Sequence, residues 1–161
     1  RWIAFTIIVS GFALEWFRSQ FCREMDEAAF YGEYLERLLS GGRSTAVRFV
    51  PHMLGDRTSF SDRAGAFSGL TLATTRDELA LAIVQSASNR VRADLRRLSR
   101  CTALQKRVFL TGRRAGPALT AYRERRLRGY SFERRENCTL LGCAVMSRKL
   151  RETRAIATAR G

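Results

Sequence analysis

The apolar residues of this chain follow two patterns, one typical of buried strands and the other typical of amphipathic helices. Residues 2–9 (WIAFTIIV) are mainly β-branched or aromatic and show no polar alternation, as in a strand covered on both faces. Further on, steps of three and four predict one apolar stripe of a long helix: Leu79, Ile83, Ala87, Val91, Leu95 and Leu98. Together these segments predict an α/β fold, with a mixed sheet packed by helices.

Glycine, serine and proline between the apolar segments set the bounds of the expected elements. We expect strands at 2–9, 48–50, 70–72, 107–110 and 130–132. We expect helices at 12–23, 27–39, 76–99, 117–127 and 139–150. The first helix should direct Phe12, Trp16 and Phe17 inward. The mixed sheet should contain the strands at 2–9, 48–50 and 107–110.

The clearest local signal is the start of the helix expected at 76–99. Thr75 and Glu78 have the spacing of a capping box, in which the Thr75 hydroxyl accepts from the Glu78 amide and the Glu78 carboxylate reaches back. Two turn glycines, Gly65 and Gly69, precede it. Asp26 can cap the second helix, and Pro117 suits the first position of the fourth.

Composition indicates a single soluble globular domain, and charge divides it into two unlike halves. The 161 residues are 45% hydrophobic and 27% charged. Residues 1–89 carry 9 arginines and 10 acids, whereas residues 90–161 carry 18 arginines, 2 lysines and 5 acids. This basic half indicates either a solvated, arginine-rich surface or a polyanion partner, such as RNA or an acidic protein subunit. The candidate polyanion patch is Arg125, Arg126, Arg128, Arg134 and Arg135.

The cysteines and the histidine do not suggest a metal site. Cys22, Cys101, Cys138 and Cys143 form no CxxC pair, and His52 is the only histidine, so no zinc site is expected. Scattered reduced thiols favour an intracellular compartment. The apolar stretch 2–14 has only 13 residues, too few to span a bilayer, so no transmembrane span is expected. The chain starts within an apolar segment, which suggests a fragment or a processed product.

Residues 65–85 closely resemble the C-terminal signature of the FGGY carbohydrate kinases. That signature reads small-x-aromatic-x-Gly-Leu, a seven-residue spacer, then acidic-Leu-x-x-Ala-aliphatic-aliphatic-Glu/Gln. Its ten fixed positions are met by Gly65, Phe67, Gly69, Leu70, Glu78, Leu79, Ala82, Ile83, Val84 and Gln85. The resemblance extends over about residues 8 to 147. It implies one C-terminal, nucleotide-binding domain over 1–161, of the actin and hexokinase (ribonuclease H-like) ATPase type, with a frayed basic tail at 148–161.

The same resemblance implies a nucleotide site that uses ATP and Mg. Gly11 matches the family's turn glycine before a Trp-containing helix, and Glu15 matches the polar position four residues later. Gly112 and Gly116 lie in the place of the family's Gly-Gly-x-x-x-[Asn/Ser]-Pro turn, which holds the nucleotide. Thr111 and Gly116 depart from that turn's pattern. Near the end of the chain, Leu-Leu-Gly-Cys-Ala resembles a family motif in which the glycine, here Gly142, allows close helix packing.

The family's catalytic aspartate and sugar-binding residues belong to an N-terminal lobe that these residues do not include, so no catalytic residue is assigned. Two interpretations stay open. The chain is the nucleotide lobe of a larger sugar kinase, partnered by the N-terminal lobe and inactive alone. Alternatively, it is a degenerate, non-catalytic subunit with a structural role or with RNA or protein partners. The first implies a cytoplasmic location and the second allows a mitochondrial assembly.

Overall fold

The computed structural model describes residues 10–53, 64–111, 116–138 and 140–148. The strand predicted at 2–9, the turn residue Gly112 and the predicted tail beyond residue 148 lie outside the described residues.

Helices form most of the described chain and lie close to the predicted bounds. α1 spans Ser10–Phe21, and α3, the longest helix, spans Arg76–Ser99. The second predicted helix contains a π-helical segment, η1 (Ala29–Tyr34), which continues into α2 (Leu35–Ser40). α4 spans Pro117–Arg126, with Pro117 in its first turn, and residues 140–148 are also helical. The structure therefore confirms the order of the helices.

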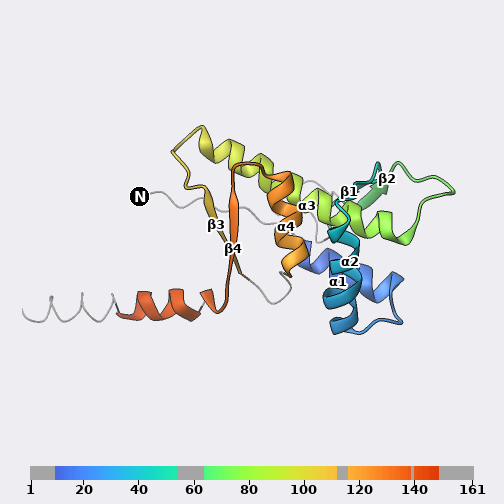
Figure 1. The fold of residues 1–161 in the computed structure, drawn as a ribbon, viewed down its shortest axis with the longest axis horizontal. Helices are drawn as coiled ribbons and strands as arrows, with labels where there is room; N and C mark the ends of the chain where they lie inside the picture. The colour runs from blue at the N-terminus through green and yellow to red at the C-terminus, as the bar shows by residue number, and fades with distance from the viewer. Residues whose placement is uncertain (1–9, 54–63, 112–115, 139, 149–161) are drawn as a thin grey trace, which may run out of the picture.

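The described strands form two separate sheets of two strands each, so the expectation of one mixed sheet is wrong for them. β1 (Arg48–Val50) pairs antiparallel with β2 (Ala66–Ser68), with Phe49 opposite Phe67. β3 (Arg107–Thr111) pairs parallel with β4 (Ser131–Arg135). Between the two sheets the chain runs through α3, whose 24 residues are about 36 Å long, and the two strand pairs form beside different parts of that helix. Figure 1 shows β3 and β4 beside the C-terminal part of α3, away from β1 and β2, which lie near its N-terminal half.

The hydrophobic core lies where α1, η1 and α2 pack against the first half of α3. Its largest fully buried apolar side chains are Phe17, Phe30, Leu39, Leu81 and Ile83. α4 joins this core through Ala118 and Tyr122. All the buried residues of α3 fall between Ala80 and Ser88, so the second half of the helix, which carries most of its arginines, is more exposed.

Three local expectations are wrong. Phe12 is 71% exposed, because α1 turns Ala13, Leu14 and Phe17 inward instead. The strand predicted at 70–72 is a turn. Pairing of Phe67 with Phe49 places the strand earlier, and the positive φ of Gly69 (77°) then bends the chain away. Among the described residues Gly142 makes no close packing contact, since residues 140–148 are exposed and a Cβ on Gly142 would meet no atom within 4 Å.

Candidate functional site

The first half of the kinase-like signature forms β2 and the residues on either side of it. A Cβ on Gly65 would lie 2.4 Å from the Met53 sulfur, so a larger residue would displace that side chain. The Phe67 ring packs on Phe49, with centroids 4.8 Å apart. Gly69 has the left-handed backbone that glycine adopts without strain. Leu70, in contrast, is 54% exposed and packs little.

The second half of the signature forms the first turns of α3 and supplies residues that are buried in the core. The capping box is confirmed: the Glu78 amide donates to Thr75 Oγ1 (3.3 Å), and the Thr75 amide donates to Glu78 Oε2 (2.9 Å). Ala82, Ile83 and Val84 are buried in the core. Gln85 donates to the Thr45 carbonyl (3.2 Å) and accepts from Arg126. Leu79 is also partly buried against the core, so nine of the ten matched positions contribute to the folded structure.

The two candidate nucleotide residues in α1 have different surroundings. Gly11 is exposed, and a Cβ there would meet no atom within 4 Å. Glu15 is engaged: its carboxylate accepts from Arg18 Nη2 (2.5 Å) and from the Tyr31 hydroxyl (3.2 Å). The hydrogen bond from Arg18 to Glu15 also raises the pKa of Arg18. Glu15 therefore braces α1 against η1 in this structure, and its role toward a nucleotide stays a prediction.

The N-terminal end of α4, where Gly116 lies, is filled by a carboxylate from α2. Glu36 Oε2 accepts from the Ala118 amide at 2.8 Å. A Cβ on Gly116 would lie 2.0 Å from Glu36 Oε1, so the glycine is what lets the carboxylate approach. Free amides at a helix N-terminus attract anions. In this chain the Glu36 carboxylate already binds there, as the acceptor of the Ala118 amide. As described, this end of α4 does not fit a nucleotide phosphate. Gly112 lies outside the described residues, so convergence of the predicted glycines stays a prediction.

This contact predicts opposite effects of alanine at two glycines. Gly116→Ala should displace Glu36 and destabilise the protein by about 0.5–2 kcal/mol, the usual cost of a lost helix cap. Gly11→Ala should instead stabilise by about 0.5–1 kcal/mol, because it adds a helix former in open space. Urea unfolding measures both. The cost of Gly116→Ala should largely disappear in a Glu36→Ala background; an undiminished cost there would contradict the contact.

The five arginines of the candidate polyanion patch divide into two groups. Arg134 and Arg135 pair with acids of their own segment, Glu136 and Glu133, each at 3.1 Å. Arg135 also lies over the Phe109 ring, 4.0 Å from its centroid.

The other three lie at the C-terminal end of α4. Arg125 donates to the Leu39 carbonyl (2.7 Å), and Arg126 donates to Gln85 and to the Tyr122 hydroxyl. Arg128 is exposed and has no partner among the described residues.

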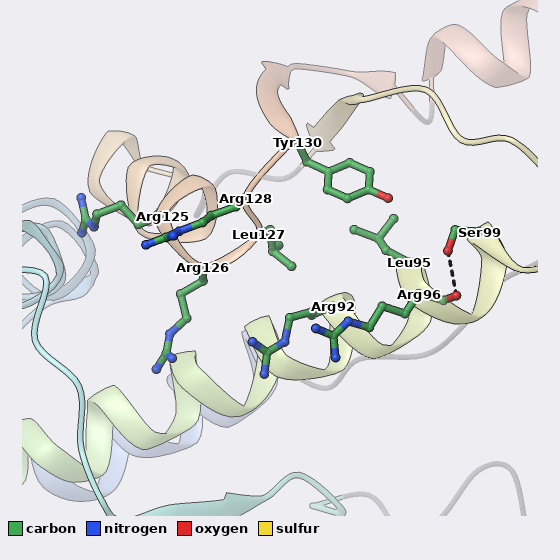
Figure 2. Close-up of a pocket in the computed structure, with 9 residues that line it drawn as sticks. All are labelled: Arg92, Leu95, Arg96, Ser99, Arg125, Arg126, Leu127, Arg128 and Tyr130. Atoms are coloured by element: carbon green, nitrogen blue, oxygen red, sulfur yellow. Dashed lines mark hydrogen bonds between the residues drawn. The ribbon is translucent and has the colours of Figure 1, made fainter.

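The sequence alone did not group Arg92 and Arg96 with this second set. The structure places them in one pocket with the end of α4, with a volume of about 460 Å³ (Figure 2). α3 supplies Arg92, Leu95, Arg96 and Ser99, and the other side supplies Arg125, Arg126, Leu127, Arg128 and Tyr130. The signal in the sequence is the four-residue spacing of Arg92 and Arg96 on an exposed helix face. Pairing that face with α4 required the fold.

Metal binding and membrane spanning find no support in the part of the chain that the structure describes. No group of three or more His, Cys, Asp or Glu side chains there could hold a metal ion. The four cysteines are free: Cys22 is buried and the other three are at least partly exposed. Among the described helices, none is long and apolar enough to cross a membrane.

Comparison with solved structures places this arrangement among the sugar kinases at the level of fold. No model of a known protein family matches the chain, and no curated protein sequence matches it. The xylulose kinase of Rhodospirillum rubrum is similar over 80% of this chain, with a TM-score of 0.64 and 23% identity. A xyloylose kinase of Brucella ovis is similar over 79%, with a TM-score of 0.56 and 22% identity. The chain spans 26% of each of these kinases. The described residues thus have a fold like part of a sugar kinase.

Proposed function

We propose that this chain is the C-terminal lobe of a carbohydrate kinase of the FGGY type, which transfers a phosphoryl group from ATP to a sugar or polyol hydroxyl. The observation that carries the proposal is the coincidence of two likenesses. The fold is similar to that of two xylulose kinases over about four-fifths of the chain. The ten signature positions at 65–85 also match those of the FGGY family.

The proposed lobe contributes nucleotide contacts rather than the base that activates the sugar. In phosphoryl transfer the protein acts mainly by positioning the reactants and neutralising charge, so both sides of the reacting centre must be present. The resemblance assigns the catalytic aspartate and the sugar-binding residues to the N-terminal lobe. We therefore propose an N-terminal kinase lobe as the partner of this chain. ATP supplies the phosphoryl group, and Mg neutralises its charge when bound.

A second candidate, a degenerate lobe with a structural or interaction role, is favoured by one observation. Glu36 occupies the amide-lined end of α4, so a phosphate there would meet a carboxylate. In the active lobe this carboxylate has to move aside. In a degenerate lobe it stays as a permanent cap.

The activity assay follows from the missing catalytic group. The chain alone should transfer no phosphate from ATP to xylulose, ribulose, glycerol or gluconate above a matched blank. A coupled assay that follows ADP release measures this directly. Turnover that a substitution in this chain abolishes would show that the described lobe carries its own catalytic base, against the proposal.

A further inference from the structure

The pocket between the second half of α3 and the end of α4 concentrates positive charge with no acid to balance it. Five of its nine lining residues are arginines, and none is an aspartate or glutamate. Of these five, the side chains of Arg96 and Arg128 have no partner among the described residues, and the Arg92 side chain contacts only the neutral Asn89 there. The pocket thus holds guanidinium groups whose donors are free for a ligand.

The acids of this part of the chain are engaged elsewhere. Asp94 pairs with Arg90 (3.2 Å), and Glu124 accepts from the Phe132 amide (2.9 Å). Glu133 and Glu136 pair with the arginines of β4. The described residues from 90 to 148 contain 14 basic side chains and these four acids. The excess charge at the pocket therefore has to be balanced from outside the described chain.

The floor of the pocket is apolar and includes an aromatic ring. Leu127 is buried, Leu95 and Tyr130 are partly buried, and the Tyr130 ring extends toward Leu95 and Ser99 (Figure 2). The Lys106 ammonium group makes a cation–π contact with this ring, with Nζ 4.9 Å from the ring centroid. An apolar floor under a cationic rim matches a ligand with a flat ring and attached phosphates, and a volume of about 460 Å³ is in the usual range for such sites.

The basic surface continues beyond the pocket along α3. Arg92, Arg96 and Arg100 follow one another at four-residue steps, so they form a row with about 6 Å between neighbours. Basic residues in a last helical turn also stabilise the helix dipole, which accounts for part of this row. Arg92 precedes that turn, and Arg128 belongs to another element. A row longer than the pocket favours an extended phosphate backbone over a single small phosphate ester.

We propose that this pocket and the adjoining row of arginines bind single-stranded nucleic acid, with a base on the Leu95, Leu127 and Tyr130 floor and phosphates on the arginines. A single strand is favoured over a duplex because its bases are free to stack on a protein ring. Arg126 is held by Gln85 and Tyr122, so one guanidinium of the rim is already fixed in position. This site lies at the opposite end of α4 from the nucleotide turn and does not depend on the proposed kinase role.

Two double variants with the same charge change test the arginine part of the proposal. Arg96→Gln/Arg128→Gln should weaken binding of a short fluorescent single-stranded oligonucleotide by ~10-fold or more in anisotropy titrations. Arg134→Gln/Arg135→Gln is the matched control, since these arginines are paired on β4, and should change affinity by about threefold or less. Binding should also fall steeply with salt. Equal losses in both variants, or no binding by the wild type, would overturn the proposal.

The aromatic floor is tested separately from charge. Tyr130→Phe keeps a ring and should retain wild-type affinity, whereas Tyr130→Ser should lose about fivefold or more. Inorganic polyphosphate should compete poorly against the oligonucleotide at equal charge, and a duplex of the same sequence should bind more weakly than the single strand. If Tyr130→Ser binds like the wild type and polyphosphate or duplex competes equally well, the pocket is a general anion surface and the proposal is wrong.

Discussion

Phe30→Ala is expected to destabilise the protein by about 3–5 kcal/mol, the usual cost of removing a buried phenylalanine. Phe30 is fully buried in the core. Its ring packs against Phe17, Tyr31 and Tyr34, with centroids 6.4, 5.0 and 5.4 Å apart. The free energy of unfolding of a small protein domain is typically about 5–15 kcal/mol. The Phe30→Ala variant should therefore be largely unfolded, or close to its unfolding transition, at room temperature.

The matched control removes the same side chain from the surface. Phe12→Ala deletes a ring that is 71% exposed and should change the free energy of unfolding by about 0.5 kcal/mol or less. Urea titrations followed by circular dichroism compare both variants with the wild type. A cost for Phe12→Ala as large as that for Phe30→Ala would mean that α1 faces the core differently from the structure described.

Tyr34→Phe is expected to cost about 1–2 kcal/mol, because it removes a hydrogen bond to a charged group. The Tyr34 hydroxyl donates to Asp77 Oδ1 at 2.8 Å and joins η1 to the first turn of α3. Tyr34 is 3% exposed, whereas the Asp77 side chain is 35% exposed and can regain water, which limits the loss. Arg76 also lies over the Tyr34 ring, 5.6 Å from its centroid.

The same residue makes stability depend on pH in the alkaline range. Burial, and then the Asp77 carboxylate, raise the pKa of Tyr34 above its ordinary value of about 10. The folded state therefore holds the phenolic proton more tightly than the unfolded state. This contribution is complete below about pH 10 and is lost as the pH rises further, because the unfolded chain ionises first.

Comparison with Tyr34→Phe isolates this contribution from other alkaline effects. Burial also raises the pKa of Cys22, which adds a loss of stability in the same direction. Both proteins keep Cys22, so it cancels from the difference between them. The stability gap between wild type and Tyr34→Phe should narrow as the pH rises above about 10. A gap that stays constant would show that Tyr34 titrates as it does in the unfolded chain.

The long helix was predictable because several local signals agreed along its length. The capping box at Thr75 and Glu78 fixed its start. The predicted apolar stripe is buried only at Ile83 and Ala87, and its other four positions are partly exposed. The same logic predicted the helix at 27–39, which the structure forms as η1 and α2. It did not predict the π-helical turns of η1, because a π-helical segment of 6 residues is too short to show an apolar period of its own.

The sheets and the site were less predictable because they depend on contacts between distant residues. The strand at Ala66–Ser68 is set by pairing of Phe67 with Phe49, whereas local propensity favoured the Leu-Thr-Leu that follows. The contact of Glu36 with the Ala118 amide joins residues 82 positions apart, and no local pattern indicates it. Likewise, separating Arg134 and Arg135 from the other arginines required knowledge of their partners in space.

The most direct test of the kinase-lobe proposal is calorimetric titration of MgADP into the wild type, Glu36→Ala and Glu33→Ala. Glu33→Ala is the matched control, because it removes the same charge from an exposed position in η1, one turn before Glu36. If the end of α4 is the nucleotide end of a kinase lobe, the wild type and Glu33→Ala should bind weakly. Glu36→Ala, which frees the amides and removes the competing carboxylate, should bind ~10-fold more tightly or better. Equally weak binding by all three proteins would contradict the kinase-lobe proposal. Tight binding by the wild type that Gly112→Arg abolishes would instead contradict the blocking role of Glu36.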